Sequence, residues 1–170
     1  MLAGEENFPE AYLQKLRAKV RPATAICIQI AATEPLIGLD YFIVTGARRV
    51  HSVYQPTNRC PELAPPGRHL FLAAARPEIS PEPVDWKKEL ELCMKDLKDL
   101  IPDFEKRAHI LLTGCYHGEW PGMHARLGTD ISRRTPIRNL YNVGDGVKPP
   151  GTTALPGAVE SACKVFEDII

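Results

Sequence analysis

The sequence predicts an α+β fold, in which a mixed β-sheet with flanking helices is followed by a terminal strand, turn and helix. Two observations predict the first part. Short β-branched and aromatic runs, separated by Pro or Gly, recur through the first half of the chain and are typical of strands. Near the middle, apolar residues recur at intervals of three and four, as in an amphipathic helix. The last part is predicted because an apolar run enters a Gly-rich turn before a second helical pattern.

Five elements are expected in the first half of the chain. An amphipathic helix is predicted from Glu10 to Arg21, where apolar residues have helical spacing. Three consecutive strands are predicted at Ala25–Ile30, Leu39–Val44 and Val50–Tyr54. The run His69–Ala75 is almost continuously apolar, which favours a central strand covered on both faces.

The clearest helix of the sequence is expected to start at Asp85. Asp85 is suited to cap a helix, because its carboxylate can accept a hydrogen bond from a first-turn amide. His109–Tyr116 is a further strand candidate, and Asn139–Gly144 is a candidate strand that runs into a Gly-rich turn. Pro156–Ile170 is predicted to be helical, with Pro156 in the first turn. The apolar face of this last helix is expected to hold Val159, Ala162, Cys163 and Phe166.

The composition excludes some classes of function. The chain has 170 residues, of which 44% are hydrophobic and 25% charged, enough for one ordinary globular core. Lys+Arg and Asp+Glu both count 21, so no cationic excess is present and no nucleic-acid partner is expected. The five cysteines form no C-x-x-C pair, which argues against a disulfide framework or structural zinc and favours a reducing, cytoplasmic setting. Acidic residues near the amino terminus argue against a secretory signal.

The most informative segment is the turn that leads into the last helix. Gly144, Asp145 and Gly146 follow the candidate strand, and glycines there allow a ligand to approach the main chain. The Asp145 carboxylate can accept hydrogen bonds, and the free amides at the start of the helix favour an electron-rich or anionic group. Taken alone, the same pattern also fits a tight turn in which Asp145 caps the backbone.

The longer pattern resembles the carboxy-terminal FAD motif of phytoene desaturase, carotenoid isomerase and amine-oxidase-like flavoproteins. The motif is a strand ending in Val-Gly-Asp-Gly, a Pro/Gly loop, and Gly-Ala-x-x-Ser on a helix, here Val143–Gly146 and Gly157–Ser161. The resemblance extends from about Thr24 to Ile170. The other segments that match the family are Leu63–His69, Glu119–Pro121 with Arg126 and Gly128, and Thr135–Ile137.

This resemblance implies a role for each part of the chain. Residues 1–138 would be a partial substrate-binding sheet domain, and residues 139–170 the carboxy-terminal piece of a Rossmann-like FAD-binding domain. Asp145, with Gly144 and Gly146 beside it, would contact the ribityl and phosphate portion of FAD. The helix start would lie against the pyrimidine edge of the flavin ring. The residues at that start are Leu155, Pro156, Gly157 and Ala158. Thr152 and Thr153 stand where relatives often have Gly, so approach of the ring over this loop is an open question.

The implied function is that of an FAD-dependent oxidoreductase related to phytoene dehydrogenases of carotenoid biosynthesis. Hydride would move between flavin and an apolar, polyene or lipid-like substrate, and the flavin would perform the difficult step without a conspicuous protein acid or base. No catalytic residue is therefore assigned. Desaturation, isomerisation, saturation and amine oxidation all remain open. Peripheral membrane contact is also compatible with such a substrate.

One expected motif does not occur in this sequence: the G-x-G-x-x-G that binds the ADP half of FAD. The FAD site is therefore incomplete in this chain, and we expect it to need a missing amino-terminal FAD-binding region or a partner chain. This part alone is expected to be inactive. The alternative is a non-catalytic module or half of a split flavoprotein. Surfaces left uncovered by a missing domain favour self-association, so a homo-oligomer is expected.

Other candidate residues have simpler interpretations. Cys115, His117 and His124 lie close in sequence, but their spacing fits no common metal site, and no metal is expected. Glu119 and Arg126 could be a catalytic acid and its partner, although an ion pair that fixes a loop explains them more simply. Trp86 and Phe104 are expected to pack in the core rather than to line a substrate tunnel.

Overall fold

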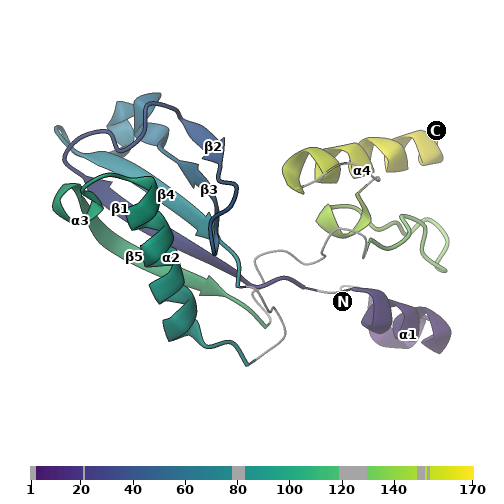
Figure 1. Ribbon diagram of the computed structural model, residues 1–170. Coiled ribbons are helices and arrows are strands. Elements are labelled where there is room, and N and C mark those ends of the chain that lie inside the picture. The colour runs from purple at the N-terminus through teal and green to yellow at the C-terminus, as the bar shows by residue number, and fades with distance from the viewer. Residues whose placement is uncertain (1–2, 21, 78–82, 119–129, 149–151, 153) are drawn as a thin grey trace. The chain divides into compact units, whose positions relative to one another are not determined.

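The computed structural model describes residues 3–20, 22–77, 83–118, 130–148, 152 and 154–170. The chain divides into two compact units, which we call the sheet unit (Thr24–Gly122) and the terminal unit (Met1–Ala23 with Met123–Ile170) (Figure 1). This division does not follow the expected boundary after residue 138, because the amino-terminal helix groups with the carboxy-terminal segment. The assignment of residues 1–138 and 139–170 to two functional domains stays a prediction.

The sheet unit is built on a five-stranded sheet. The strands are β1 (Ala25–Ala32), β2 (Tyr41–Ile43), β3 (Val50–Tyr54), β4 (His69–Ala75) and β5 (Ala108–Tyr116). Their order is β2-β3-β4-β1-β5, and every neighbouring pair is antiparallel. The predicted α+β class, a sheet with flanking helices, is confirmed. No parallel pair occurs in the described part of the sheet, although a mixed sheet was expected.

One face of the sheet carries the core of this unit. Side chains alternate along β1, so that Ile26, Ile28 and Ile30 are buried while their neighbours are half exposed. Phe71 and Val53 join them from β4 and β3. The strand β4 lies between β3 and β1, as predicted for a central strand, but its buried and half-buried residues alternate. The expectation that it is covered on both faces was therefore wrong.

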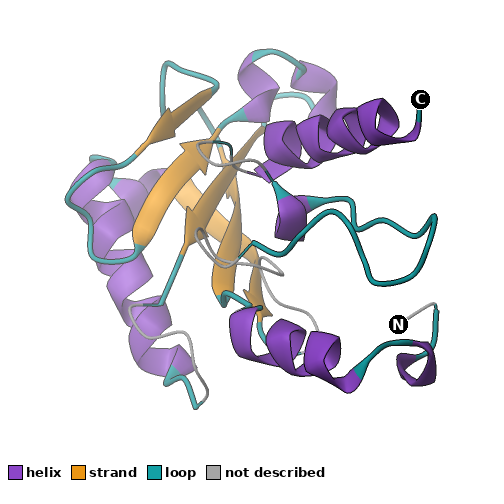
Figure 2. Ribbon diagram, turned by 90° about the vertical axis from the view of Figure 1, so that its right-hand side faces the viewer, coloured by secondary structure: helices purple, strands orange, loops and turns teal. Residues whose placement is uncertain are grey.

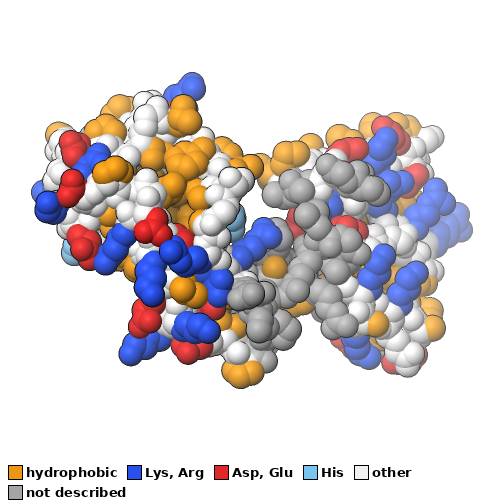
Figure 3. Space-filling model, viewed as in Figure 1, with side chains coloured by type: hydrophobic (Ala, Val, Ile, Leu, Met, Phe, Trp, Pro, Cys, Tyr) orange, Lys and Arg blue, Asp and Glu red, His pale blue; other side chains and the backbone are white. Residues whose placement is uncertain are grey.

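The helix α2 (Trp86–Leu100) covers this core face and lies on one side of the sheet in both views (Figures 1 and 2). Asp85 caps it, since its carboxylate accepts a hydrogen bond from the Lys88 amide at 3.1 Å, as predicted. Cys93 and Leu97 are fully buried against the strands. Lys, Arg, Asp and Glu side chains crowd the outer surface over α2 (Figure 3).

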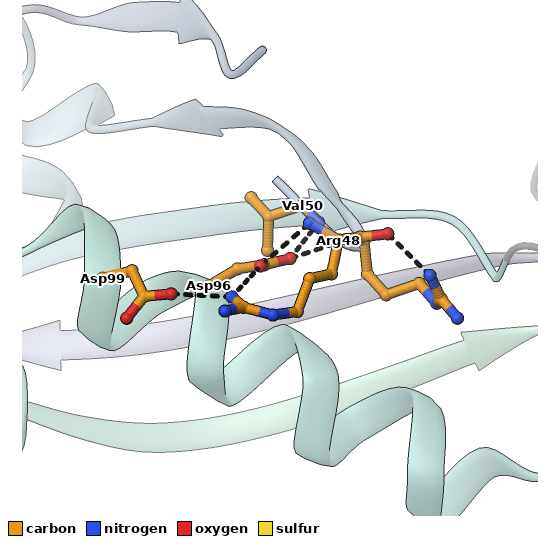
Figure 4. A network of polar contacts seen from close by, with 5 residues as sticks. Arg48, Val50, Asp96 and Asp99 are labelled. Carbon is orange, nitrogen blue, oxygen red and sulfur yellow. Dashed lines mark hydrogen bonds and ion pairs between the residues drawn. The ribbon is translucent and has the colours of Figure 1, made fainter. Parts of the chain in front are cut away.

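A buried carboxylate joins α2 to the connection between β2 and β3 (Figure 4). Asp96 is 4% exposed and accepts hydrogen bonds from the amides of Arg48, Arg49 and Val50 at 2.9, 2.6 and 3.0 Å. The Arg48 guanidinium bonds the same carboxylate at 2.9 Å and the exposed Asp99 at 2.7 Å. All of these partners belong to the protein, so Asp96 serves the fold rather than a ligand.

The terminal unit contains α1 (Glu10–Lys19), the short 3-10 helix η4 (Asp145–Val147) and α4 (Ala154–Ile169). Both long helices were predicted. Asn142 donates from its side-chain amide to the hydroxyl of Tyr12 at 3.0 Å, which connects α1 to the segment before η4. The shorter elements of the whole chain are η1 (Glu5–Asn7), η2 (Pro56–Asn58), η3 (Pro61–Leu63) and α3 (Phe104–Arg107). No helix in the described residues has the length and apolar character to cross a bilayer.

Candidate functional site

The predicted cofactor-binding residues gather around η4 and the start of α4. The expected strand Asn139–Gly144 does not form: within the described residues, this segment makes only an isolated bridge between Arg134 and Tyr141. Asn139 has φ 62° and Gly144 has φ 119°, and these positive values interrupt an extended strand. The chain instead arrives at Asp145 as a loop. The 3-10 helix that Asp145 begins packs against α4 (Figure 2).

Asp145 lies beside a buried lysine that sequence reasoning did not single out. Lys148 has a side chain that is only 3% exposed. Its ammonium contacts Asp130 Oδ1 at 2.9 Å, the Asp145 carbonyl at 2.6 Å and Asp145 Oδ1 at 3.5 Å. A buried ammonium needs such partners, because removal from water disfavours its charge. The signal in the sequence was the i, i+3 spacing of Asp145 and Lys148 after a glycine pair.

The Asp145 carboxylate keeps capacity for a further partner. Its side chain is 24% exposed, so it borders solvent. Its Oδ1 atom is buried and accepts no hydrogen bond from the described residues, while the Lys148 ammonium lies too far away to donate one well. Buried polar atoms in proteins are nearly always hydrogen-bonded. The part of the carboxylate that borders solvent would accept a hydrogen bond from an incoming hydroxyl group or amide.

Two small residues fix the turn against the helix. Ser161 is fully buried; its hydroxyl accepts a hydrogen bond from the Gly144 amide at 2.9 Å and donates to the Ala158 carbonyl at 2.6 Å. Gly157 lies so close to the loop that a Cβ atom there would be 2.8 Å from both Lys148 Cβ and Thr152 Oγ1. The sequence therefore needs glycine at 157 for close approach of α4 to the loop.

The other residues predicted at the helix start differ in exposure. Leu155 is 76% exposed, Pro156 is exposed, and Ala158 is half-buried. The structure thus brings Gly144, Asp145 and Gly146 near the start of α4, as expected. The loop between them lies partly outside the described residues, including Thr153. Whether these seven residues bind a cofactor stays a prediction.

The apolar face predicted for α4 is on the outside of the terminal unit. Val159 and Phe166 are 58% and 65% exposed, and Ala162 and Cys163 are exposed as well. The buried side of the helix carries Gly157, Ser161 and Val165 instead. An exposed apolar stripe of this kind is unusual on a soluble surface and indicates a binding face.

Within the sheet unit, no described helix packs on the face of the sheet opposite α2. The strand register assigns to it alternate residues from all five strands. These residues are Tyr41, Ile43, Ser52, Tyr54, Leu70, Leu72, Ala74, Ala25, Cys27, Gln29, Ala31, His109, Leu112, Gly114 and Tyr116. None is Asp, Glu, Lys or Arg. Leu112 and Tyr116 are 55% and 44% exposed, and the rings of Tyr41 and Tyr54 lie 4.7 Å apart. We call this surface the open sheet face.

The remaining candidates form no second site among the residues that the structure describes. Cys115 is on β5, and the His117 ring packs 5.2 Å from Trp86; His124, Glu119 and Arg126 lie outside the described residues. Among the described residues, no three His, Cys, Asp or Glu side chains gather as metal ligands would. Phe104 is 4% exposed and belongs to the core, and Trp86 packs against it at the core edge, as expected.

Comparison with known proteins gives the following likenesses. None of the protein-family models compared with the chain matches it. The chain is 32% identical over 155 residues to the uncharacterized protein MJ1488 of Methanocaldococcus jannaschii, a match that covers 91% of this chain and 38% of the relative. It resembles the crystal structure of an oxidoreductase from Methanosarcina mazei with a TM-score of 0.84 and 36% identity, over 95% of this chain and 39% of that one.

A third likeness concerns the fold alone. The PF1083 protein of Pyrococcus furiosus matches with a TM-score of 0.69 and 24% identity, over 98% of this chain and 36% of that one. In all three cases the chain spans less than two fifths of the length of the matched protein. The arrangement described here is thus a recurring part of larger proteins.

Proposed function

We propose that this chain is the carboxy-terminal part of an FAD-dependent oxidoreductase of the phytoene desaturase-like family. The observation that carries the proposal is the likeness to the Methanosarcina mazei oxidoreductase over 95% of the chain. The assignment of FAD rests on the segment from Val143 to Ser161, whose sequence resembles the flavin motif and whose residues meet around η4.

The residues around η4 fit a hydroxyl-rich part of FAD. The Asp145 carboxylate, which borders solvent, would accept a hydrogen bond from a ribityl hydroxyl group. Lys148 would hold the turn in place through its contacts with Asp145 at the start of η4 and with Asp130. The exposed start of α4 would offer the free amide of Leu155 and a partial positive charge to the pyrimidine edge.

The open sheet face supports an apolar substrate. Because it bears no ionised Lys, Arg, Asp or Glu side chain, it can cover a polyene or lipid-like chain without leaving charges desolvated. Bound flavin would supply the hydride chemistry. The protein's part would be to exclude water and to orient the substrate, for which rigid aromatic residues such as Tyr41 and Tyr54 are suited.

A second candidate is a module that binds FAD only together with another polypeptide. It is favoured by one observation: the 170 residues contain no G-x-G-x-x-G, although the matched proteins are more than twice as long. The two candidates differ in where that motif resides. The reading frame upstream of this segment should encode a strand followed by G-x-G-x-x-G if the first candidate is right; its location on a separate gene favours the second.

The FAD assignment is tested by one substitution and its control. The complete protein, with or without a partner chain, is titrated with FAD while flavin fluorescence is recorded. Asp145→Asn should weaken binding about tenfold, since a hydrogen bond to a charged acceptor contributes about 1.5–3 kcal/mol. Glu167→Gln, a charge change on the exposed side of α4, should not alter it. Equal affinities for Asp145→Asn and the unsubstituted protein would remove the role of this turn in FAD binding.

A further inference from the structure

The sheet unit holds a cavity that the proposed flavin site does not use. Its volume is about 500 Å³, within the usual range for small organic ligands. It lies where β1 ends and where β4 and β5 begin, three strands that are neighbours in the sheet. The loop before β4 and the end of α3 close it on two sides. Its apolar lining comes from Ala31, Leu63, Pro65, Leu70, Ala108 and Leu111.

Each polar residue that lines this cavity is either basic or uncharged. Arg68, Lys106 and Arg107 line it together with His69 and His109, and no Asp or Glu is among its lining residues. The chain as a whole has equal numbers of acidic and basic residues, so this is a local concentration of cationic groups. A positive potential in a partly apolar hollow attracts anions that also have an apolar portion.

Two of these cationic side chains have acidic partners among the described residues. The Arg107 guanidinium contacts Glu34 at 2.5 Å and the Pro35 carbonyl at 2.9 Å, and the Lys106 ammonium contacts Asp103 at 3.0 Å.

By contrast, the Arg68 side chain makes no ion pair with any of the residues that the structure describes. The Nδ1 atom of His69 is buried and has no hydrogen-bond partner among them.

We propose that this cavity binds an amphipathic anion, a molecule in which an apolar chain ends in a carboxylate or phosphate group. Arg68 pairs with the anionic group, and the chain packs on Leu70, Leu111 and Pro65. The site lies wholly within the sheet unit and needs neither FAD nor the segment around Asp145. Its lining includes Ala31, Leu70 and His109 of the open sheet face, so it shares part of the proposed substrate surface, but its test does not depend on FAD binding.

The 170-residue chain is titrated by calorimetry with decanoate, decyl phosphate and decanol, all below their aggregation concentrations. Both anions should bind about tenfold more tightly than decanol, because one charge-assisted hydrogen bond accounts for about that factor. The tighter of the two identifies the preferred head group. Arg68→Gln should weaken anion binding about tenfold and leave decanol binding unchanged. Arg59→Gln is the matched control: Arg59 is a 79% exposed arginine of the same unit, paired with Asp40 outside the cavity, and its loss should change nothing.

Three outcomes would overturn the proposal. Decanol that binds as tightly as decanoate would mean that the cavity selects only apolar chains. Anion affinity that is equal in the Arg68→Gln and Arg59→Gln variants would place the anion elsewhere. Binding to anionic phosphatidylglycerol vesicles without binding to either free anion would make this surface a membrane contact. Circular dichroism of each variant confirms that it is folded, which is expected because both arginines are exposed.

Discussion

Replacement of Asp96 by asparagine should destabilise the sheet unit strongly. Oδ2 of Asp96 accepts from the amides of Arg49 and Val50, while Oδ1 accepts from the Arg48 amide and guanidinium. Asparagine has one acceptor oxygen, and its amino group would face the donors on the other side. Two hydrogen bonds to a charged acceptor are lost, and relaxation of the neighbouring groups recovers part of their energy. We therefore expect the free energy of unfolding to fall by about 2–4 kcal/mol.

The assay is urea denaturation, in which the free energy of unfolding is read from tryptophan fluorescence. Asp99→Asn is the control, because Asp99 is on the same helix and bonds the same Arg48 at 2.7 Å but is 66% exposed. That variant should lose less than about 1 kcal/mol. Equal losses for Asp96→Asn and Asp99→Asn would refute the argument that burial and amide bonding make Asp96 important.

The same variant has a predictable pH dependence. Burial alone raises the pKa of Asp96, but hydrogen bonds from the amides of Val50, Arg48 and Arg49 outweigh it and hold the pKa below 3.8, its ordinary value. A depressed pKa in the folded state gives stability that is present above the unfolded value and lost as the pH falls through the folded one. The stability gap between the unsubstituted protein and Asp96→Asn should therefore be full near neutral pH and shrink below pH 3.8. A gap that does not change with pH would contradict this.

Three further predictions concern single side chains. Gly157→Val should destabilise the terminal unit by about 1–3 kcal/mol because its Cβ would be 2.8 Å from Lys148, as thermal denaturation would show; an unchanged melting temperature would mean that the loop yields freely. Ser161→Ala should cost about 1–3 kcal/mol by leaving the Gly144 amide unbonded, to be measured by urea denaturation, and a neutral effect would show that water replaces the hydroxyl. Burial raises the pKa of Cys93 to about 12, so iodoacetamide at neutral pH should label the exposed Cys60 and leave Cys93 unmodified in the folded protein; rapid labelling of Cys93, read by mass spectrometry, would contradict its burial.

Local chemistry made much of the fold predictable from the sequence. The strands β1, β3 and β4, the helix α2 and its cap at Asp85 follow from alternation, β-branched residues and a capping carboxylate. The sequence could not reveal that β4 has one open face, because small apolar residues such as Ala74 are tolerated on both covered and uncovered surfaces. Coverage depends on which elements pack above the sheet, which is not a local property.

The candidate site was predictable in its residues more than in its structure. The Gly-Asp-Gly turn and the glycine of α4 were recognised, but the expected strand before them is a loop, since apolar residues do not make a strand without a neighbouring strand to pair with. Lys148 was missed because a lysine in a polar turn usually lies in solvent. Val159 and Phe166 point outward because Gly157 lies on the other side of α4 and packs that side against the loop. The spacing of apolar residues alone does not show which side of the helix is buried.

The most direct test of the account is a crystal structure of the complete protein that contains this chain, grown with FAD. We expect a ribityl hydroxyl group within hydrogen-bonding distance of the Asp145 carboxylate, and the pyrimidine edge of the flavin against the start of α4 near Pro156. FAD bound elsewhere, with Asp145 still contacting only Lys148, would contradict the central claim that this turn and helix hold the cofactor.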